Sequence, residues 1–210
     1  YSTILLKDVV ARENIRNVSF LNDLVEYLAD NLGNMFSASN IAKYLKSQRP
    51  TVSTQTVINY ITPLLNAFFI HKVNRMDING LKIFEIGEKY YFEDLGLRNV
   101  IRGYNLGKEI QKLLENAVYL HLLRCSYDVK VGQQGNYEID FIGSKNGNRI
   151  YIQVAYQLMD ERTREREFGN LMNITDHYPK YVVSMDEFNA GTNEKGIQQI
   201  HIREFLMTAL

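Results

Sequence analysis

The chain has 210 residues, with a hydrophobic fraction of 45% and an aromatic fraction of 11%, which is typical of a globular protein and excludes a disordered one. Lysine plus arginine and aspartate plus glutamate number 24 each, so the formal net charge of zero provides no overall field to attract a polyanion. This length is sufficient for two small hydrophobic cores.

Cysteine usage and the lack of targeting patterns indicate the compartment. Cys125 is the single cysteine, which excludes an internal disulfide and is typical of a reducing environment. No apolar run reaches the roughly 18 residues of a membrane span, and no signal-peptide pattern opens the chain. We therefore expect a cytoplasmic protein without a membrane partner. Because the chain begins at Tyr1 rather than at methionine, we also expect it to be part of a longer protein.

The first half of the sequence predicts three helices followed by a hairpin. Apolar residues recur at helical spacing in three segments, 17–31, 37–48 and 53–66. Two strand-like runs follow, 68–73 and 81–86, and the segment that joins them contains Asn79-Gly80, a strong hairpin signal. This order predicts a winged helix-turn-helix domain with an N-terminal extension in residues 1–100.

Two interpretations of this domain are open. In the first, the third helix enters a DNA major groove and nearby lysines hold phosphates. The residues of that interface would be Lys43, Lys46, Gln55, Asn59, Lys72 and Lys82. In the second, the domain docks onto a protein and its charges only solvate one face. The exposed positions of the third helix carry no cation, which favours the second interpretation.

The second half, residues 106–210, predicts a mixed sheet with flanking helices. Helical patterns occupy 107–124 and 168–174, and the charged run 160–167 is typical of an exposed helix start. Strand patterns occupy 127–131, 137–142, 149–156, 180–185 and 197–202. Strict alternation in the second strand would place Glu138, Asp140 and Ile142 on one face. The expected fold class is α+β or α/β, with a winged helix followed by a restriction-endonuclease-like domain.

A helix acid, a strand acid and a third-strand pair two residues apart resemble the PD-(D/E)XK nuclease core. In active members, a helix Glu, a strand Asp and a strand Glu gather Mg²⁺, and a Lys two residues later stabilises charge. Glu115 and Asp140 match this pattern, whereas Gln153 and Ala155 stand where the Glu and Lys would be. An amide supplies no charge to offset a divalent cation, and a methyl group cannot replace the lysine. We therefore expect a degenerate catalytic site, with weak or absent metal binding by Glu115 and Asp140.

Two further readings of this half are open. A metal-dependent DNA nuclease with a rearranged site on Glu115, Asp140 and Glu138 is the enzymatic alternative. A contact between domains or between copies of the chain is the other. The four histidines show no metal-ligand spacing, and His201 is expected to be a packed or edge residue.

The sequence from Tyr90 to Asn99, YYFEDLGLRN, shortly precedes LLENAVYLHLLR at 113–124, and Glu138–Phe141 and Ile152–Tyr156 follow. Together these segments resemble the C-terminal region of bacterial and archaeal AAA+-type ATPases that contain a DUF4143 domain. The resemblance implies an upstream P-loop ATPase domain as a partner in the same chain. No Gly-x-x-x-x-Gly-Lys-[Ser/Thr] motif occurs here, so ATP would bind upstream and no cofactor is expected in these residues. The implied role is a non-catalytic regulatory region that recognises nucleic acid or protein.

Overall fold

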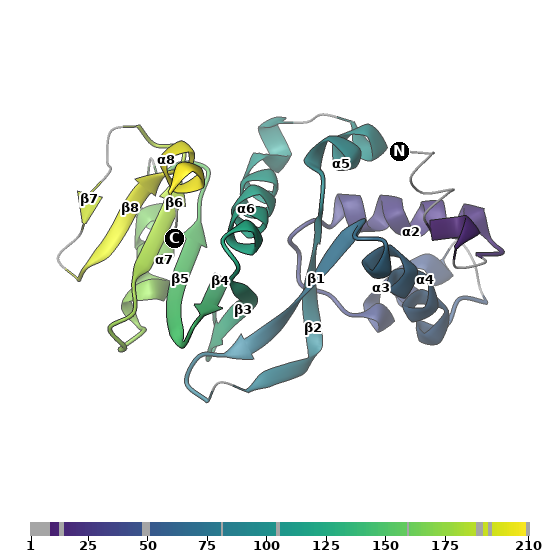
Figure 1. Cartoon of the computed structure of the whole chain (residues 1–210), viewed down its shortest axis with the longest axis horizontal. Helices are drawn as coiled ribbons and strands as arrows, with labels where there is room; N and C mark the ends of the chain where they lie inside the picture. Colours follow the sequence, from purple (N-terminus) through teal and green to yellow (C-terminus); the bar gives the residue numbers. More distant parts are fainter. Residues whose placement is uncertain are drawn as a thin grey trace. The chain divides into compact units, whose positions relative to one another are not determined.

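The computed structural model describes residues 9–12, 15–47, 51–80, 82–103, 106–158, 160–187, 191–192 and 195–208. These residues form seven α-helices and eight strands of a mixed α+β protein (Figure 1). None of the described helices combines the length and apolar character that crossing a membrane requires. By packing, the chain divides into two units. The first contains Tyr1–Lys72 and Ile86–Asn105, and the second contains Val73–Glu85 and Leu106–Leu210.

Three capped helices open the first unit, and they confirm the three predicted helices. They are α2 (Val18–Asp30), α3 (Ala38–Lys46) and α4 (Thr54–Asn66). The side chains of Asn17, Ser37 and Ser53 each accept a hydrogen bond from a backbone N–H of the first turn, which the helix itself leaves unpaired. Each helix buries one apolar stripe, and this burial drives the helices together.

A fourth helix of this unit, α5 (Leu95–Arg102), is fixed by a buried guanidinium. Arg98 is fully buried and donates from Nε (3.2 Å) and Nη2 (3.1 Å) to the carbonyl oxygen of Ala29, near the end of α2. This carbonyl is one that the last turn of a helix leaves unpaired. The apolar pattern does not predict α5, because Arg98 is its one buried residue.

The hairpin that follows α4 is longer than predicted. Its strands are β1 (Ile70–Asp77) and β2 (Ile83–Phe92). Within the first unit, Phe36 forms an isolated bridge with Glu88 of β2. The outer part of the hairpin belongs to the second unit, where residues 75–77 of β1 pair in parallel with 131–133.

The second unit is built on a mixed sheet with strand order β2-β1-β3-β4-β5-β6-β8-β7. Its further strands are β3 (Asp128–Gln134), β4 (Tyr137–Lys145), β5 (Asn148–Val154), β6 (Lys180–Ser184), β7 (Gly191–Thr192) and β8 (Ile197–His201). Strands β3, β4 and β5 are antiparallel neighbours, whereas β5, β6 and β8 run parallel. The helices are α6 (Leu106–Arg124), α7 (Glu161–Met172) and α8 (Ile202–Met207).

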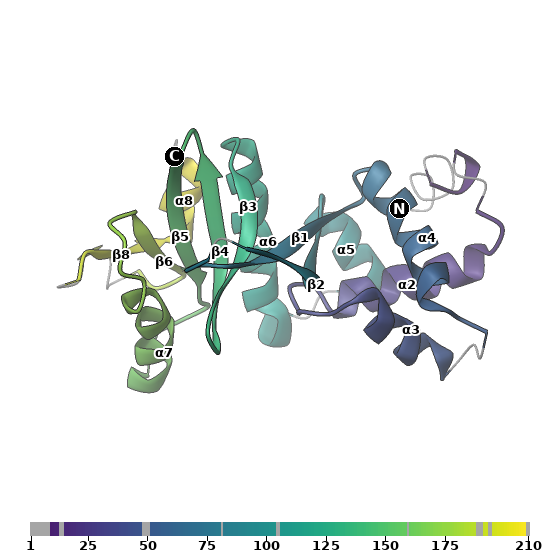
Figure 2. The same ribbon diagram turned by 90° about the horizontal axis from the view of Figure 1, so that it is seen from below.

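Helices cover both faces of this sheet (Figure 2). On one face, Phe168 and Leu171 of α7 share an apolar cluster with Ile142, Tyr151 and Val182. On the other, the ring of Tyr119 in α6 lies 6.1 Å from Phe141, and Phe205 of α8 lies 6.0 Å from Tyr181. The side chains of neighbouring strand residues such as Tyr181 and Val182 therefore pack against helices on opposite faces of the sheet.

Strand β4 contains a bulge that breaks the predicted alternation. Two steps along β3, from Lys130 to Gly132, are matched by three along β4, from Ile142 to Ile139. One extra residue therefore lies between Ile139 and Ile142, and both side chains reach the same apolar cluster. The expectation that Glu138, Asp140 and Ile142 share one face is wrong, because the bulge resets the alternation at Asp140.

Candidate functional site

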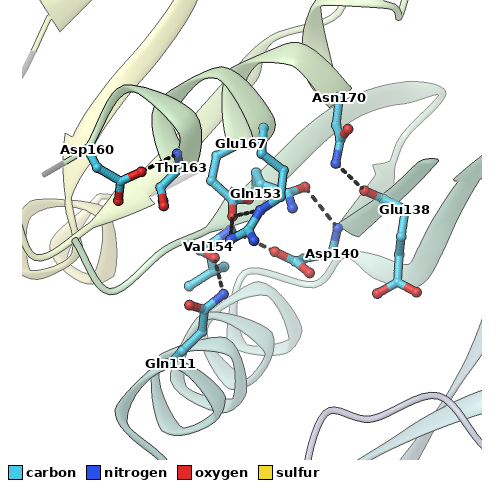
Figure 3. A network of polar contacts seen from close by, with 10 residues as sticks. Gln111, Glu138, Asp140, Gln153, Val154, Asp160, Thr163, Glu167 and Asn170 are labelled. Atoms are coloured by element: carbon cyan, nitrogen blue, oxygen red, sulfur yellow. Dashed lines mark hydrogen bonds and ion pairs between the residues drawn. The ribbon is translucent and has the colours of Figure 1, made fainter. Parts of the chain in front are cut away.

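Asp140 and Gln153 bind each other's strands where the ladder between β4 and β5 ends (Figure 3). The last backbone pair on this side is Phe141 with Ile152. Beyond it, the Asp140 N–H donates to Gln153 Oε1 (3.3 Å), and the Val154 N–H donates to Asp140 Oδ2 (2.8 Å). Both residues are buried, so each side chain satisfies a backbone group that would otherwise lack a partner. Two side chains thus replace the ladder hydrogen bonds.

Both helical layers contribute to the same network. Gln111 of α6 donates from Nε2 to the Val154 carbonyl (3.1 Å), and Asn170 of α7 donates from Nδ2 to the Glu138 carbonyl (3.1 Å). The side chain of Glu138 points away from the Asp140 carboxylate (Figure 3). Glu138 therefore takes part in this network through its backbone, as an acceptor.

Glu167 of α7 is a buried carboxylate that the sequence analysis did not identify. Its side chain is 3% exposed, and its Oε1 accepts from Nε (3.0 Å) and Nη2 (2.6 Å) of Arg166, which is 63% exposed. The expectation that the charged run 160–167 is an exposed helix start is wrong for Glu167, which is buried. The spacing of Arg164, Glu167, Phe168 and Leu171 at three and four residues is the signal that Glu167 lies on the buried side.

The other two predicted positions lie in different surroundings. Ala155 is 1% exposed within the apolar cluster of α7, and its N–H donates to the Val183 carbonyl (2.9 Å). Glu115 is buried on α6, the helix that covers the opposite face of the sheet. The structure therefore brings Asp140 and Gln153 into direct contact and places Ala155 in an apolar core.

The polar groups at this position are engaged in hydrogen bonds to backbone groups. Asp140 Oδ2 already accepts the Val154 N–H, and Gln153 offers an uncharged oxygen that accepts the Asp140 N–H. Across the described part of the chain, no group of three or more His, Cys, Asp or Glu side chains is arranged to hold a metal ion. Magnesium is usually held by carboxylates with water and phosphate in octahedral geometry, and Asp140 is the carboxylate of the Asp140–Gln153 pair.

The predicted nucleic-acid residues divide between the two units. Lys43 and Lys46 are exposed on α3, and Lys72 is exposed at the end of the first unit's share of β1. On the exposed side of α4, Gln55 Nε2 donates to Asn59 Oδ1 (2.8 Å), one turn further along. Lys82 is also exposed, but it belongs to the second unit.

Two buried histidines have structural partners. His201 Nδ1 accepts from the Arg203 N–H (3.0 Å) and so caps α8. His121 of α6 lies 3.0 Å from Nη2 of Arg124 and packs its ring against Phe205. Burial and the neighbouring Arg124 guanidinium lower the pKa of His121, so the neutral imidazole is favoured.

Two relatives match 99% and 78% of this chain. An uncharacterized protein of Haemophilus influenzae is 33% identical over 207 residues, which cover 99% of this chain and 50% of that protein. The uncharacterized protein MJ1544 of Methanocaldococcus jannaschii is 30% identical over 168 residues, covering 78% of this chain and 36% of that protein. The chain thus spans half or less of the length of these relatives.

Among solved structures, the crystal structure of protein VC1899 from Vibrio cholerae is similar at a TM-score of 0.31 and 13% identity. The similarity covers 92% of this chain and 55% of that one.

The predicted membership in the DUF4143-containing ATPases is wrong. The family model that matches residues 1–108 is that of a different domain, and neither relative's description names an ATPase. The upstream ATPase partner that followed from that resemblance therefore has no support. The chain belongs to the family defined by the domain of unknown function DUF8612, whose model matches residues 1–108.

Proposed function

We propose that this chain is a non-catalytic recognition region, made of a winged-helix unit and a unit with a degenerate PD-(D/E)XK-like fold. The observation that carries the proposal is the reciprocal bonding of Asp140 and Gln153 to each other's strands. A catalytic carboxylate must be able to bind a metal ion or a proton of the substrate. Here the two polar groups nearest that role hold the sheet together.

The neighbourhood of Ala155 supports the same conclusion. In an active nuclease of this type, a cation two residues beyond the strand carboxylate would stabilise negative charge in the transition state. Ala155 lies in an apolar cluster with Phe168 and Leu171. A lysine at this position would have to bury its ammonium group among apolar side chains, which is strongly unfavourable.

The helix order of the first unit supports the winged-helix assignment. Three capped helices, α2 to α4, precede the β1–β2 hairpin, which is the order that a winged helix requires. On α4, Gln55 and Asn59 lie on the exposed side, whereas Val57 and Ile61 are buried. An exposed polar face on a rigidly packed helix is suited to recognition of a partner.

Nicking of supercoiled plasmid in 5–10 mM Mn²⁺ or Mg²⁺, concentrations of the order that saturate weak two-carboxylate sites, tests the non-catalytic assignment. Calorimetric titration of the chain with Mn²⁺ provides a second measurement. We expect no cleavage above background and no saturable heat. Gln153→Glu adds the missing carboxylate and should raise Mn²⁺ affinity in the same titration.

Metal-dependent nicking by the wild-type chain that Asp140→Asn abolishes would overturn the proposal. That result would favour the alternative, a metal-dependent nuclease. Asp140→Asn is the suitable variant because its amide oxygen can still accept the Val154 N–H and so preserve the strands.

A further inference from the structure

One segment has a net positive charge because it lacks acidic residues, although the whole chain is neutral. Residues 31–76 contain no aspartate or glutamate, and their cations are Lys43, Lys46, Arg49, Lys72 and Arg75. The segment immediately before, 17–30, has the opposite composition, with Asp23, Glu26 and Asp30 and no lysine or arginine. The charge separation coincides with structure, because 17–30 contains α2 whereas 31–72 contains α3, α4 and the start of β1.

The lysines of this segment are available to a partner. Lys43, Lys46 and Lys72 are all exposed, and none of them forms an ion pair within the described part of the first unit. Tyr44, between the two α3 lysines, is 53% exposed. Cations that form no ion pair attract phosphates more strongly than the same number of paired cations, because no bound carboxylate competes for them.

An aromatic residue of the same segment is exposed at the point where α4 ends. Phe68, between α4 and β1, has φ of 51° and is 69% exposed. Its left-handed backbone ends α4, because the Phe68 N–H donates to the Leu65 carbonyl (3.0 Å) and the Phe69 N–H donates to the Leu64 carbonyl (2.9 Å). The exposed ring itself gains little from burial. The ring lies 6.4 Å from His71 and four residues before Lys72.

We infer that the exposed lysines and the exposed Phe68 ring of the first unit's part of this segment bind nucleic acid. Lys43, Lys46 and Lys72 hold backbone phosphates, and the Phe68 ring stacks on a base. A cationic surface combined with an exposed aromatic ring suits nucleic acid better than an acidic protein, because carboxylates have no flat face for stacking. The inference rests on the proposed recognition function and names the partner of its first unit.

Fluorescence anisotropy with a labelled 20-nucleotide single strand and the matching duplex tests the inference, in EDTA so that no metal-dependent cleavage can occur. We expect binding at about 50 mM salt, and the logarithm of the binding constant should fall linearly with the logarithm of the salt concentration. The triple variant Lys43→Ala, Lys46→Ala, Lys72→Ala should flatten this slope by roughly 2–3 for either ligand. The matched control Arg162→Ala, Lys195→Ala, Arg203→Ala removes the same charge from the second unit and should leave the slope unchanged.

Phe68→Asn separates a binding role from a folding role. Asparagine tolerates the left-handed region, so the denaturation midpoint should stay unchanged. Loss of base stacking should weaken binding of the single strand by on the order of tenfold. The two ligands show whether the stacked base comes from an unpaired strand. If it does, Phe68→Asn should lose affinity for the single strand and keep its affinity for the duplex.

Three results would overturn the inference: binding of neither ligand at about 50 mM salt, equal losses in the two triple variants, or wild-type affinity for both ligands in Phe68→Asn. Tighter binding of polyglutamate than of either oligonucleotide would instead assign the surface to an acidic protein. Plasmid nicking would contradict the proposed non-catalytic function without affecting these EDTA measurements. The two proposals can therefore fail independently.

Discussion

The candidate functional residues of the two units are used in opposite ways. In the first unit, Gln55, Asn59 and the lysines of α3 lie at the surface, and the fold leaves them accessible. In the second unit, Asp140 and Gln153 are buried and bind backbone groups of the neighbouring strand. Residue types that are typical of a functional site can therefore serve to stabilise the fold instead. In the function that we propose, availability more than residue type separates a recognition surface from a former catalytic position.

The largest effect should come from Asp140→Ala. Removal of the carboxylate leaves the buried Val154 N–H without its acceptor, and a charged acceptor makes this bond stronger than a neutral one. We expect the free energy of unfolding to fall by about 3 kcal/mol, measured by urea denaturation. Asp140→Asn, which keeps an acceptor oxygen, should lose clearly less.

The sign of this effect tests the comparison itself. Catalytic carboxylates that repel one another commonly destabilise the fold, so their removal stabilises it. An Asp140→Ala variant more stable than the wild type would show that Asp140 is maintained for function, and the contrast between the units would be lost.

A second, smaller loss of stability should follow from adding a side chain at Gly132, beside the β4 bulge. A Cβ on Gly132 would lie 2.9 Å from the Ile139 Cβ and 3.1 Å from the Ile142 Cδ1. The Ile139 Cβ is attached directly to the backbone and cannot rotate away. Gly132→Ala should therefore cost about 2 kcal/mol of unfolding free energy, as overpacked cores do.

Gly169→Ala is the matched control for that substitution. Gly169 lies inside α7, and a Cβ there would meet nothing within 4 Å. Alanine should stabilise the helix by roughly 0.5–1 kcal/mol. Equal changes in the free energy of unfolding of the two variants would mean that Ile139 and Ile142 do not crowd Gly132. That result would contradict a bulge at this position of β4.

Much of the fold follows from local patterns, and its departures have identifiable causes. Helices α2, α3 and α4 were predicted because each has an apolar stripe and a capping residue. Helix α5 was not predicted, because its buried residue is Arg98, whose hydrogen-bond partner Ala29 is distant in sequence. Strand β2 was predicted too short, since alternation cannot reveal that a residue such as Lys89 is buried.

The candidate site was less predictable than the fold. The resemblance to the PD-(D/E)XK core put Asp140 and Gln153 at one site, and in the structure the Asp140 N–H donates to Gln153 Oε1. Spacing could not show that the two side chains bind backbone groups, since this depends on where the β4–β5 ladder ends. The bulge between Ile139 and Ile142 was equally hidden, because a strand with an extra residue has the same composition as a regular one.

A third prediction concerns a buried hydroxyl of the second unit. Tyr151 donates to Asp176 Oδ2 (2.5 Å), and burial together with this bond raises the Tyr151 pKa to about 12. The folded state thus keeps the phenol proton more tightly than the unfolded state, whose tyrosine pKa is near 10. This contribution to stability is complete below pH 10 and declines as the pH rises from 10 towards 12.

Tyr151→Phe should lower the free energy of unfolding by about 1 kcal/mol at neutral pH, because the Asp176 carboxylate loses a donor. The difference between the two proteins should shrink as the pH increases from 10 to 12. Urea denaturation of both proteins across this range isolates Tyr151 from the lysines, which titrate equally in both. A constant difference would show that the hydroxyl does not titrate within this window.

The smallest effect is expected on the exposed side of α4. Gln55 and Asn59 bond to each other across one helical turn, and such pairs stabilise a helix by only about 0.2–0.5 kcal/mol. Alanine has the higher helix propensity and offsets this loss, so Gln55→Ala with Asn59→Ala should change the free energy of unfolding by less than about 0.5 kcal/mol. Nucleic-acid affinity, measured on the same double variant, should fall if these amides face the partner. A stability loss as large as that of Asp140→Ala would mean that the α4 amides also stabilise the fold. The exposed side of α4 would then not be a separate recognition face.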